Sequence, residues 1–460
     1  MSKNIVKNRY GFICFGEINT PVDRLNMKHD EGLAQIQELG FECVDAGLVI
    51  DDPPYETADA AIARLKEASD LCAIVVCVAG WIPTHAVIRV CDHFRHLPML
   101  LWGLCGWKDN GRLITTAEQA GTTAMRRVFE EMGYKFKYIT DQTDRERDVA
   151  GIADFLTAAA TAKTLRSSRV GSFGYRDMIL YNTQYEAVSL RRDIGVEVEH
   201  MELLQLYQRA QEVTQAEIDE RRAYIMENWT IHGEYDPAIL ERACRYAAAL
   251  SALADERKFD ALTLNDVDGM KRLLNYPPAL TFMLVSALDG IQVIPENDVL
   301  GNVTQLMLSY LSGGQISPYV EFYEFMNDYV LAGVPDFIPP AVSQAVELEQ
   351  KAFGLLDKSL LNVSKLRLGR LTLGRLFADS GSYAFHLVTG EAKAPPAWGE
   401  YGWDDPIPQL PSTALHLDVP VKEFTDNVMS QHISFVYGDY ANRVIDLAYL
   451  IDLPVLAHIG

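Results

Sequence analysis

Two glutamates flank an apolar helix that we predict to begin after Asp298. Glu296 follows a short apolar strand over 291–294, at the carboxyl end of that strand. Apolar residues then recur at helical spacing as far as Gly313, and an extended segment leads to Glu321. The helix is apolar on more than one side, so we expect it to be buried. An unpaired buried carboxylate is very costly, and oxygen ligands suit Mn²⁺ or Mg²⁺, so a divalent-metal site is one explanation of the pattern.

A purely structural interpretation of the same acids is also open. Aspartate is a preferred helix N-cap, so Asp298 is well placed to cap the helix. Glu296 could then act on the helix dipole, and Glu321 could be an ordinary charge at the edge of a strand. Residue types alone favour this structural interpretation over a metal site, since structural ion pairs also gather acids.

The motif END-x-x-G at 296–301, followed by an apolar helix, LSGG and an acidic segment, resembles the metal-binding core of the L-fucose isomerase and L-arabinose isomerase superfamily. In that superfamily the glutamate of END, a second acid after the helix and a histidine near the C-terminus bind a divalent cation. The matching positions here are Glu296, Glu321 and His432. His432 lies in SQHISFVYGDY, which is similar to the H-x-x-x-x-YGD element of the shorter members. The resemblance covers most of the chain.

The resemblance implies an aldose–ketose isomerase whose cofactor is Mn²⁺, or another divalent cation such as Mg²⁺ or Co²⁺. Two carboxylates and one imidazole leave coordination positions open for sugar oxygens, as a catalytic metal requires. Glu296 and Glu321 would also be the catalytic residues, on either side of the C1–C2 bond of a substrate that reacts through a cis-enediol. No histidine lies between Glu321 and His386, so the pattern is closer to the fucose isomerases than to the arabinose isomerases.

The substrate stays open at this level. Many members of the superfamily carry Cys-Trp after the strand equivalent to 260–264, where this chain has Asn265-Asp266-Val267-Asp268. The chain is also shorter than the classical fucose isomerases, so we do not expect fucose itself. One alternative is the same chemistry on an anionic 6-modified hexose such as sulfoquinovose. Another is a sugar-binding protein on the same scaffold without catalysis.

Four residues are candidates for substrate binding. Trp81 follows an apolar strand and matches the aromatic residue that the first domain of the resembled family lends to a neighbouring subunit. Arg24 and Arg176 each follow the first strand of an α/β segment, and Trp403 lies in a long Pro/Gly/Trp-rich loop. Aromatic packing in a core or interface is the alternative for the tryptophans, and simple solvation for the arginines. The resemblance implies a homo-oligomer, with a hexamer as the expected form.

The order of elements predicts an α/β fold with three domains. Within 1–165, near-continuous apolar strands alternate with amphipathic helices, which is typical of parallel sheets covered on both faces. Residues 166–320 repeat this texture and carry Glu296. Residues 321–460 are rich in alternating strands and turns, and they carry His432. We therefore expect two Rossmann-like parallel-sheet domains followed by a β-rich, antiparallel barrel-like domain.

Charge and cysteine content restrict the class of protein. The 460 residues carry a net charge of −22, which argues against nucleic acid or an anionic membrane as a partner because both attract basic surfaces. The seven cysteines are odd in number and lack CxxC spacing, as expected of free thiols in a reducing cytosol. The apolar segment 10–15 that follows the basic N-terminus is too short for a signal-peptide core, and no run approaches the length of a transmembrane helix. We expect a cytoplasmic protein that acts on a small-molecule sugar.

Overall fold

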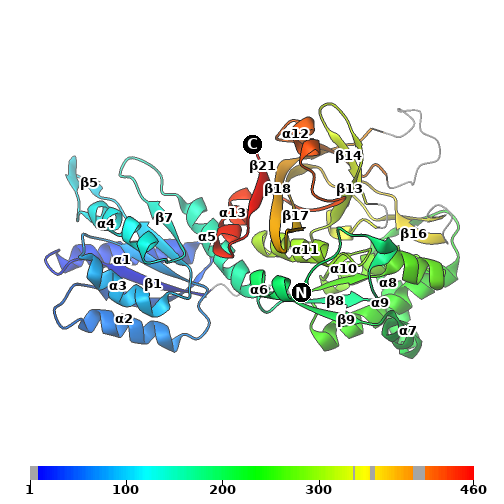
Figure 1. Ribbon diagram of the computed structural model, residues 1–460, viewed down its shortest axis with the longest axis horizontal. Coiled ribbons are helices and arrows are strands. Elements are labelled where there is room, and N and C mark those ends of the chain that lie inside the picture. The colour runs from blue at the N-terminus through cyan, green and yellow to red at the C-terminus, as the bar shows by residue number, and fades with distance from the viewer. Residues whose placement is uncertain (1–8, 335–336, 353–357, 397–409) are drawn as a thin grey trace. The chain divides into compact units, whose positions relative to one another are not determined.

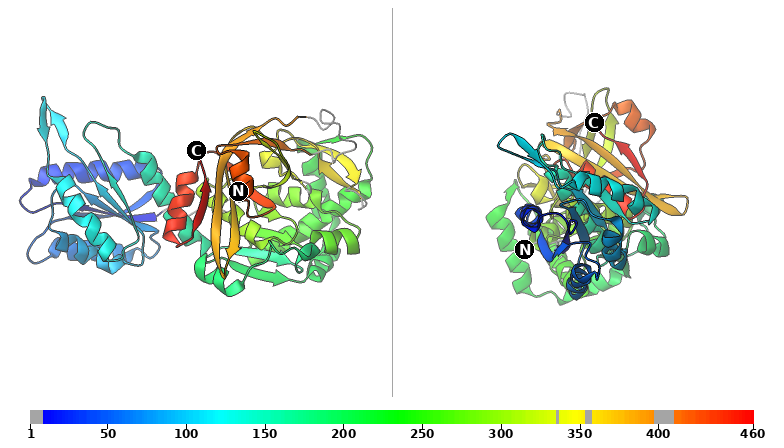
Figure 2. Two further views of the ribbon diagram at one scale, coloured as in Figure 1. Left: turned by 45° about the horizontal axis from the view of Figure 1, so that its top comes forward. Right: turned by 90° about the vertical axis from the view of Figure 1, so that its left-hand side faces the viewer.

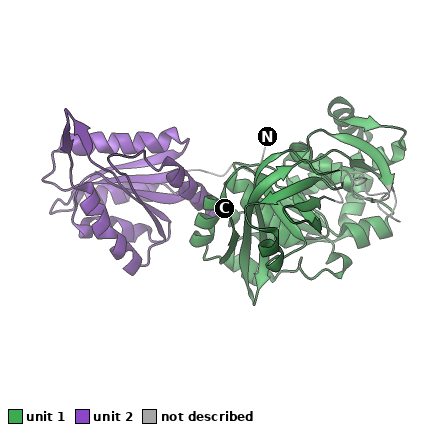
Figure 3. Ribbon diagram, turned by 90° about the horizontal axis from the view of Figure 1, so that it is seen from above, with its two compact units in different colours: residues 1–5, 165–460 green, residues 6–164 purple. Residues whose placement is uncertain are grey.

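The computed structural model describes residues 9–334, 337–352, 358–396 and 410–460. The chain forms two compact units, of which unit 2 contains Val6–Thr164 and unit 1 contains Leu165–Gly460 (Figure 3). The second and third domains that the sequence predicts, 166–320 and 321–460, both lie within unit 1, so a boundary between them remains a prediction. Trp403 lies outside the described residues.

Unit 2 is built on a parallel sheet with strand order β2-β1-β3-β4-β7. Its strands are β1 (Arg9–Phe15), β2 (Glu42–Val49), β3 (Ala73–Val78), β4 (Met99–Gly103) and β7 (Phe136–Thr140), with a separate hairpin of β5 (Trp107–Asp109) and β6 (Arg112–Ile114). Its helices are α1 (Val22–Glu38), α2 (Glu56–Glu67), α3 (Thr84–Cys91), α4 (Glu118–Glu131) and α5 (Val149–Leu165).

Helices cover both faces of this sheet (Figures 1 and 2). Every residue of β3 and β4 is buried, which explains why these strands read as continuous apolar runs. Side chains of α2, α3 and α4 pack with one set of strand residues in a single core. On the other face α1 approaches closely at Gly32, where an added Cβ would meet Phe12 and Cys77 at 3.2 Å.

The first part of unit 1 contains a second parallel sheet, with strand order β12-β11-β8-β9. Its strands are β8 (Arg169–Phe173), β9 (Glu197–Met201), β11 (Ala261–Leu264) and β12 (Gln292–Ile294). The helices of this part are α6 (Ala187–Asp193), α7 (Leu203–Glu212), α8 (Gln215–Asn228), α9 (Pro237–Arg257), α10 (Ala279–Asp289) and α11 (Val299–Leu311). Unit 1 also contains a separate three-stranded sheet formed by β10 (Thr230–His232), β15 (Glu347–Ala352) and β16 (Lys358–Asn362).

The second part of unit 1 is a closed barrel of six antiparallel strands. Its strand order is β17-β20-β13-β14-β19-β18, and β18 pairs with β17 to close the ring. The strands are β13 (Tyr319–Phe325), β14 (Val330–Gly333), β17 (Gly369–Asp379), β18 (Ser382–Lys393), β19 (Thr413–Leu417) and β20 (His432–Tyr437). Helices α12 (Val421–Asp426) and α13 (Ala441–Leu450) accompany them, and β21 (Val455–His458) adds to β18 in parallel.

Helix α11 connects the two parts of unit 1. It packs against β11 and β12 of the parallel sheet and against β17 and β20 of the barrel, and all of its residues are buried, as the sequence predicts. The expectation of parallel α/β sheets followed by an antiparallel barrel is confirmed, whereas the finer Rossmann-like classification remains a prediction. Among the described residues, every helix is too short or too polar to cross a membrane.

Candidate metal centre

Glu296 and Asp298 lie where the chain leaves β12 and enters α11. Asp298 caps the helix, since its side chain accepts a hydrogen bond from the backbone N–H of Gly301 at 2.9 Å, so the predicted cap is confirmed. The backbone of Glu296 is left-handed, with φ of 63°. In this conformation the Glu296 carboxylate comes within 3.3 Å of His432 on β20.

Glu321 and His432 come from adjacent strands of the barrel. Strands β13 and β20 are antiparallel, and Glu321 lies directly opposite His432 in their register. Directly opposed residues project their side chains to the same face of a sheet. The pairing of these two strands therefore brings together a glutamate and a histidine that lie far apart in the sequence.

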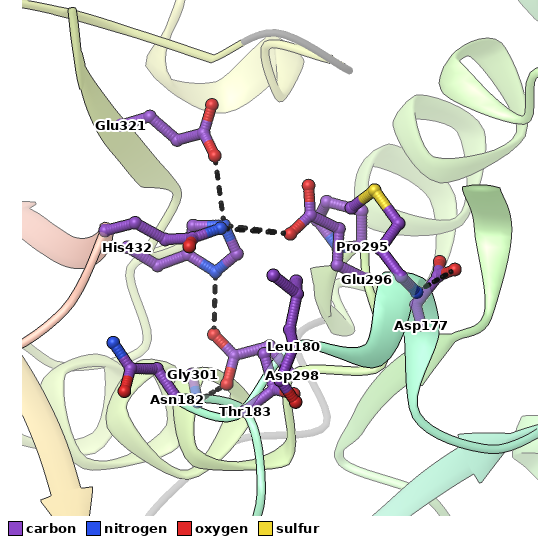
Figure 4. A network of polar contacts seen from close by, with 12 residues as sticks. Asp177, Leu180, Asn182, Thr183, Pro295, Glu296, Asp298, Gly301, Glu321 and His432 are labelled. Atoms are coloured by element: carbon purple, nitrogen blue, oxygen red, sulfur yellow. Dashed lines mark hydrogen bonds and ion pairs between the residues drawn. The ribbon is translucent and has the colours of Figure 1, made fainter. Parts of the chain in front are cut away.

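The three side chains converge on a small volume. Nε2 of His432 lies 3.3 Å from Oε2 of Glu296 and 3.3 Å from Oε1 of Glu321. One ligand atom from each residue lies within 4.8 Å of the other two. Figure 4 shows both carboxylates on the Nε2 side of the ring. Two carboxylate oxygens and one imidazole nitrogen at this spacing fit a divalent cation, and the identity of the cation is not set by the geometry.

A contact of Nδ1 with Asp298 sets the orientation of the His432 ring. Nδ1 lies 2.8 Å from Oδ2 of Asp298, and the rings of Tyr319 and His432 pack in a T-shaped arrangement. When the ring is neutral and donates Nδ1–H to this carboxylate, Nε2 carries the lone pair that can bind a cation, whereas a proton occupies Nε2 when the ring is charged. Histidine ligands in metal sites are commonly held by such an outer carboxylate, which fixes the tautomer and the ring orientation.

The electrostatics of the centre favour positive charge at His432. Burial by itself would lower the pKa of His432, but Asp298, Glu296 and Glu321 outweigh that effect and raise the pKa well above its ordinary value. Burial by itself would raise the pKa of Asp298, but the Arg375 charge and then His432 reverse this and lower the pKa well below its usual range. Asp298 is therefore ionised. Together with Glu296 and Glu321 it stabilises positive charge at His432.

Arg375 is a part of the centre that sequence reasoning missed. It is 2% exposed, it donates from both terminal nitrogens to the Asp298 carboxylate, and it also donates to the backbone O of Asn182 at 2.8 Å. The signal in the sequence was an arginine inside the apolar run LTLGRLF of β17, where a buried charge requires a partner. The assignment of Asp298 as a helix cap was correct but incomplete, because Asp298 also joins Arg375 to His432.

A cavity of about 530 Å³ opens beside the three ligand residues. Glu321 lines it directly, and Gln431 reaches from its wall to Oε2 of Glu296 at 3.4 Å. The rest of the wall is partly apolar and partly polar: Asn182, Phe322, Phe325, Val428, Met429 and Ser430. The site thus combines three converging side chains that could hold a metal ion with space for a small polar molecule.

Three of the four predicted substrate residues lie in the described chain, and none of the three is among the residues that line the cavity. Trp81 is 40% exposed and belongs to unit 2. Arg24, expected in a loop, lies in α1 of the same unit because that helix begins at Val22. Arg176 is in unit 1, where its guanidinium lies 5.0 Å from the ring of Tyr181, and it is not among the residues that line the cavity. A substrate role for any of these three remains a prediction.

Comparison with known protein families and curated proteins does not identify a family or a function for this site. No model of a known protein family matches the chain, and no curated protein matches it.

Proposed function

We propose that the protein is a divalent-metal-dependent aldose–ketose isomerase that acts on a small sugar. The observation that carries this proposal is the convergence of Glu296, Glu321 and His432 beside a cavity of about 530 Å³. The resemblance of the END and HISFVYGD elements to the fucose isomerases supports the same reaction. Mn²⁺ is the cation that the resemblance favours, with Mg²⁺ or Co²⁺ as alternatives.

The residues divide between holding the cation and moving protons. Glu296, Glu321 and His432 would hold the ion, and Asp298 would keep Nε2 of His432 directed at it. A bound divalent ion supplies Lewis-acid polarisation of the sugar oxygens at C1 and C2.

Isomerisation then needs two proton transfers that balance. A carboxylate accepts the proton from C2 and returns it to C1, while the proton of the C2 hydroxyl passes to the oxygen on C1. Glu296 and Glu321 approach His432 from different elements, β12–α11 and β13, so they can act on different sides of a bound substrate. Carboxylates in different environments commonly divide acid and base roles in this way.

The substrate class is proposed as a neutral aldose. None of the described residues that line the cavity is an arginine or a lysine. An anionic 6-modified hexose such as sulfoquinovose would have to find its positive partner outside that set, for example at Arg24 or Arg176. A sugar-binding protein without catalysis is the competing function on the same scaffold.

One experiment separates these possibilities. The protein is stripped with chelator, and neutral and 6-anionic aldoses are offered with and without Mn²⁺ while ketose formation is followed by NMR. We expect turnover only with the metal, and deuterium from an aldose labelled at C2 should appear at C1 of the ketose, with the remainder exchanged into solvent. Full activity in excess chelator would contradict the metal assignment. Binding of Mn²⁺ and sugar without ketose formation across the panel would instead indicate a binding protein.

A further inference from the structure

The polar segment that follows β11 has no role in the proposed reaction, although it lies at the centre of the sheet edge that carries the site. It forms a π-helical turn over Asp266–Lys271. Asp266 is 0% exposed and Lys271 is 3% exposed, so both ends of this turn bury a charged side chain. Because β11 lies between β8 and β12, the turn leaves the sheet next to the Glu296 junction.

Asp266 and Lys271 form an ion pair that the turn itself creates. Nζ of Lys271 lies 2.8 Å from Oδ2 of Asp266. A π-helix closes its hydrogen bonds between residues five positions apart, which brings these two residues together. π-helical turns are rare and are frequently found at functional sites. A matched pair in this position neutralises the buried carboxylate without occupying all of its oxygens.

The other oxygen of Asp266 acts on the first metal ligand. Oδ1 accepts a hydrogen bond from the backbone N–H of Glu296 at 2.6 Å. Glu296 and Asn297 have φ of 63° and 51°, and two consecutive non-glycine residues in the left-handed region need support from their surroundings. Asn297 receives its support from the backbone O of Leu264 at 3.0 Å and from Ser172, while Asp266 supports Glu296.

Hydrogen bonds to a residue that follows the neighbouring strand β8 hold the first residues of the π-helical turn. Asp177, which follows β8, is 0% exposed and accepts hydrogen bonds from the backbone N–H groups of Val267 and Asp268, both at 2.8 Å. Its position relative to the metal-site residues can be followed in Figure 4. Asn265 also accepts from the N–H of Gly269. These hydrogen bonds hold the π-helical turn in place. Asp266 therefore has a fixed position from which it can orient the backbone of Glu296.

We infer that Asp266, held by Lys271 and the π-helical turn, is a positioning residue that sets the left-handed backbone of Glu296 and thereby directs its carboxylate to the cation. The inference rests on the proposed function, because it takes Glu296 to be a metal ligand. Asp266 touches neither the cavity nor the other two ligands in the contacts described. Its contact with the Glu296 segment is the hydrogen bond that it accepts from the backbone N–H of Glu296.

A pair of double variants tests the hydrogen bond that Asp266 accepts from Glu296. Asp266→Asn with Lys271→Met and Asp266→Ala with Lys271→Met both remove the two buried charges. Only the asparagine retains an oxygen that can accept from Glu296. Mn²⁺ affinity is measured by the EPR signal of free Mn²⁺, and folding is checked by circular dichroism and thermal unfolding in chelator. We expect the asparagine variant to bind within about threefold of the wild type, and the alanine variant at least about tenfold more weakly, as for other outer-shell partners.

Asp266→Glu provides a second test that keeps the charge for Lys271. Its carboxylate is displaced by one methylene, so we expect a loss of Mn²⁺ affinity of about tenfold with little change in thermal unfolding in chelator. If the alanine variant does not fold, this variant decides the question. Wild-type affinity in Asp266→Glu, or equal affinities in the two double variants, would overturn the positioning role. Absence of Mn²⁺ binding by the wild-type protein would instead overturn the proposed function itself.

Discussion

Both units bury ionised side chains, but they balance the charge differently. In unit 2, Lys28 and Glu118 are 2% and 0% exposed and form an ion pair. Lys28 also donates to the backbone O of Cys105 at 2.8 Å, and Glu118 accepts from the N–H of Thr116 at 2.9 Å. One positive charge meets one negative charge, and backbone groups take up further hydrogen bonds. Such a pair ties α1 to the start of α4.

The cluster in unit 1 has an excess of negative charge, and its Glu321 side chain is 22% exposed while the other members are buried. Glu296, Asp298 and Glu321 all contact the imidazole of His432, and Arg375 binds Asp298. A matched buried pair positions the chain, whereas an excess of one sign beside a cavity indicates a site for a ligand of the other sign. The comparison thus separates a structural ion pair from a candidate metal centre with the same residue types.

The largest expected effect follows from removing one ligand charge. Glu296→Gln or Glu321→Gln keeps the size of the side chain but loses basicity and a charged oxygen. Each should lower kcat by at least about a hundredfold, the lower range for loss of general acid–base catalysis. Steady-state assays with saturating Mn²⁺ measure this. Glu324→Gln is the matched control, since Glu324 is exposed on the same strand and should keep its activity. Equal kcat in all three variants would remove the catalytic assignment.

The second test applies the same kind of change to both buried clusters. Asp298→Asn retains a helix cap but loses the charge that faces Arg375 and His432, and Glu118→Gln loses the charge that faces Lys28. Breaking a buried pair is expected to cost about 3–5 kcal/mol of unfolding free energy in either unit. Only Asp298→Asn should weaken Mn²⁺ binding, by about tenfold to a hundredfold.

Calorimetry and Mn²⁺ titration of these two variants test the comparison directly. Equal Mn²⁺ affinities in Asp298→Asn and Glu118→Gln would show that the charge excess in unit 1 has no bearing on the metal.

The buried histidines His386 and His458 belong to neither charged cluster. We expect them to make stability, but not Mn²⁺ binding, depend on pH. His386 on β18 and His458 on β21 lie with their ring nitrogens 2.8 Å apart, and burial, followed by the His458 charge, lowers the pKa of His386 to about 4. The folded protein keeps His386 neutral, whereas the unfolded chain binds a proton below about pH 6.5. Stability should therefore be full above about pH 6.5 and fall by up to about 3 kcal/mol as the pH drops toward 4.

Denaturant unfolding of the wild type and His386→Gln between pH 4 and 7 measures this loss. The variant should show a shallower dependence on pH. Parallel profiles for the two proteins would contradict the assignment to His386.

The smallest expected effect concerns Trp81, the exposed residue of unit 2 that the resemblance assigns to substrate binding. Trp81→Leu should leave Mn²⁺ affinity and thermal unfolding unchanged and raise KM by roughly threefold to tenfold, the value of one aromatic contact. If a subunit lends Trp81 to its neighbour, mixing Trp81→Leu with Glu296→Gln subunits should restore part of the activity. An unchanged KM would contradict a substrate-binding role for Trp81.

The local features of the site were accessible from the sequence. A strand, a turn and a capped helix occupy consecutive residues, so apolar periodicity and cap preferences were enough to place Glu296 and Asp298 at the entry to α11. Continuous apolar runs such as AIVVCV predicted strands buried on both faces, and β3 is buried throughout. Local sequence determines such elements because each depends on neighbours within a few residues.

The relations between distant elements were decided only by tertiary structure. Glu321 faces His432 because β13 and β20 pair in one particular register, and a slip of one residue would turn either side chain to the opposite face of the barrel. Arg375 reaches Asp298 because α11 packs against β17. The apolar periodicity of either element alone does not predict that contact. The sequence by itself determined which residues could bind a cation. Strand register and helix packing decided that three carboxylates meet at a single imidazole.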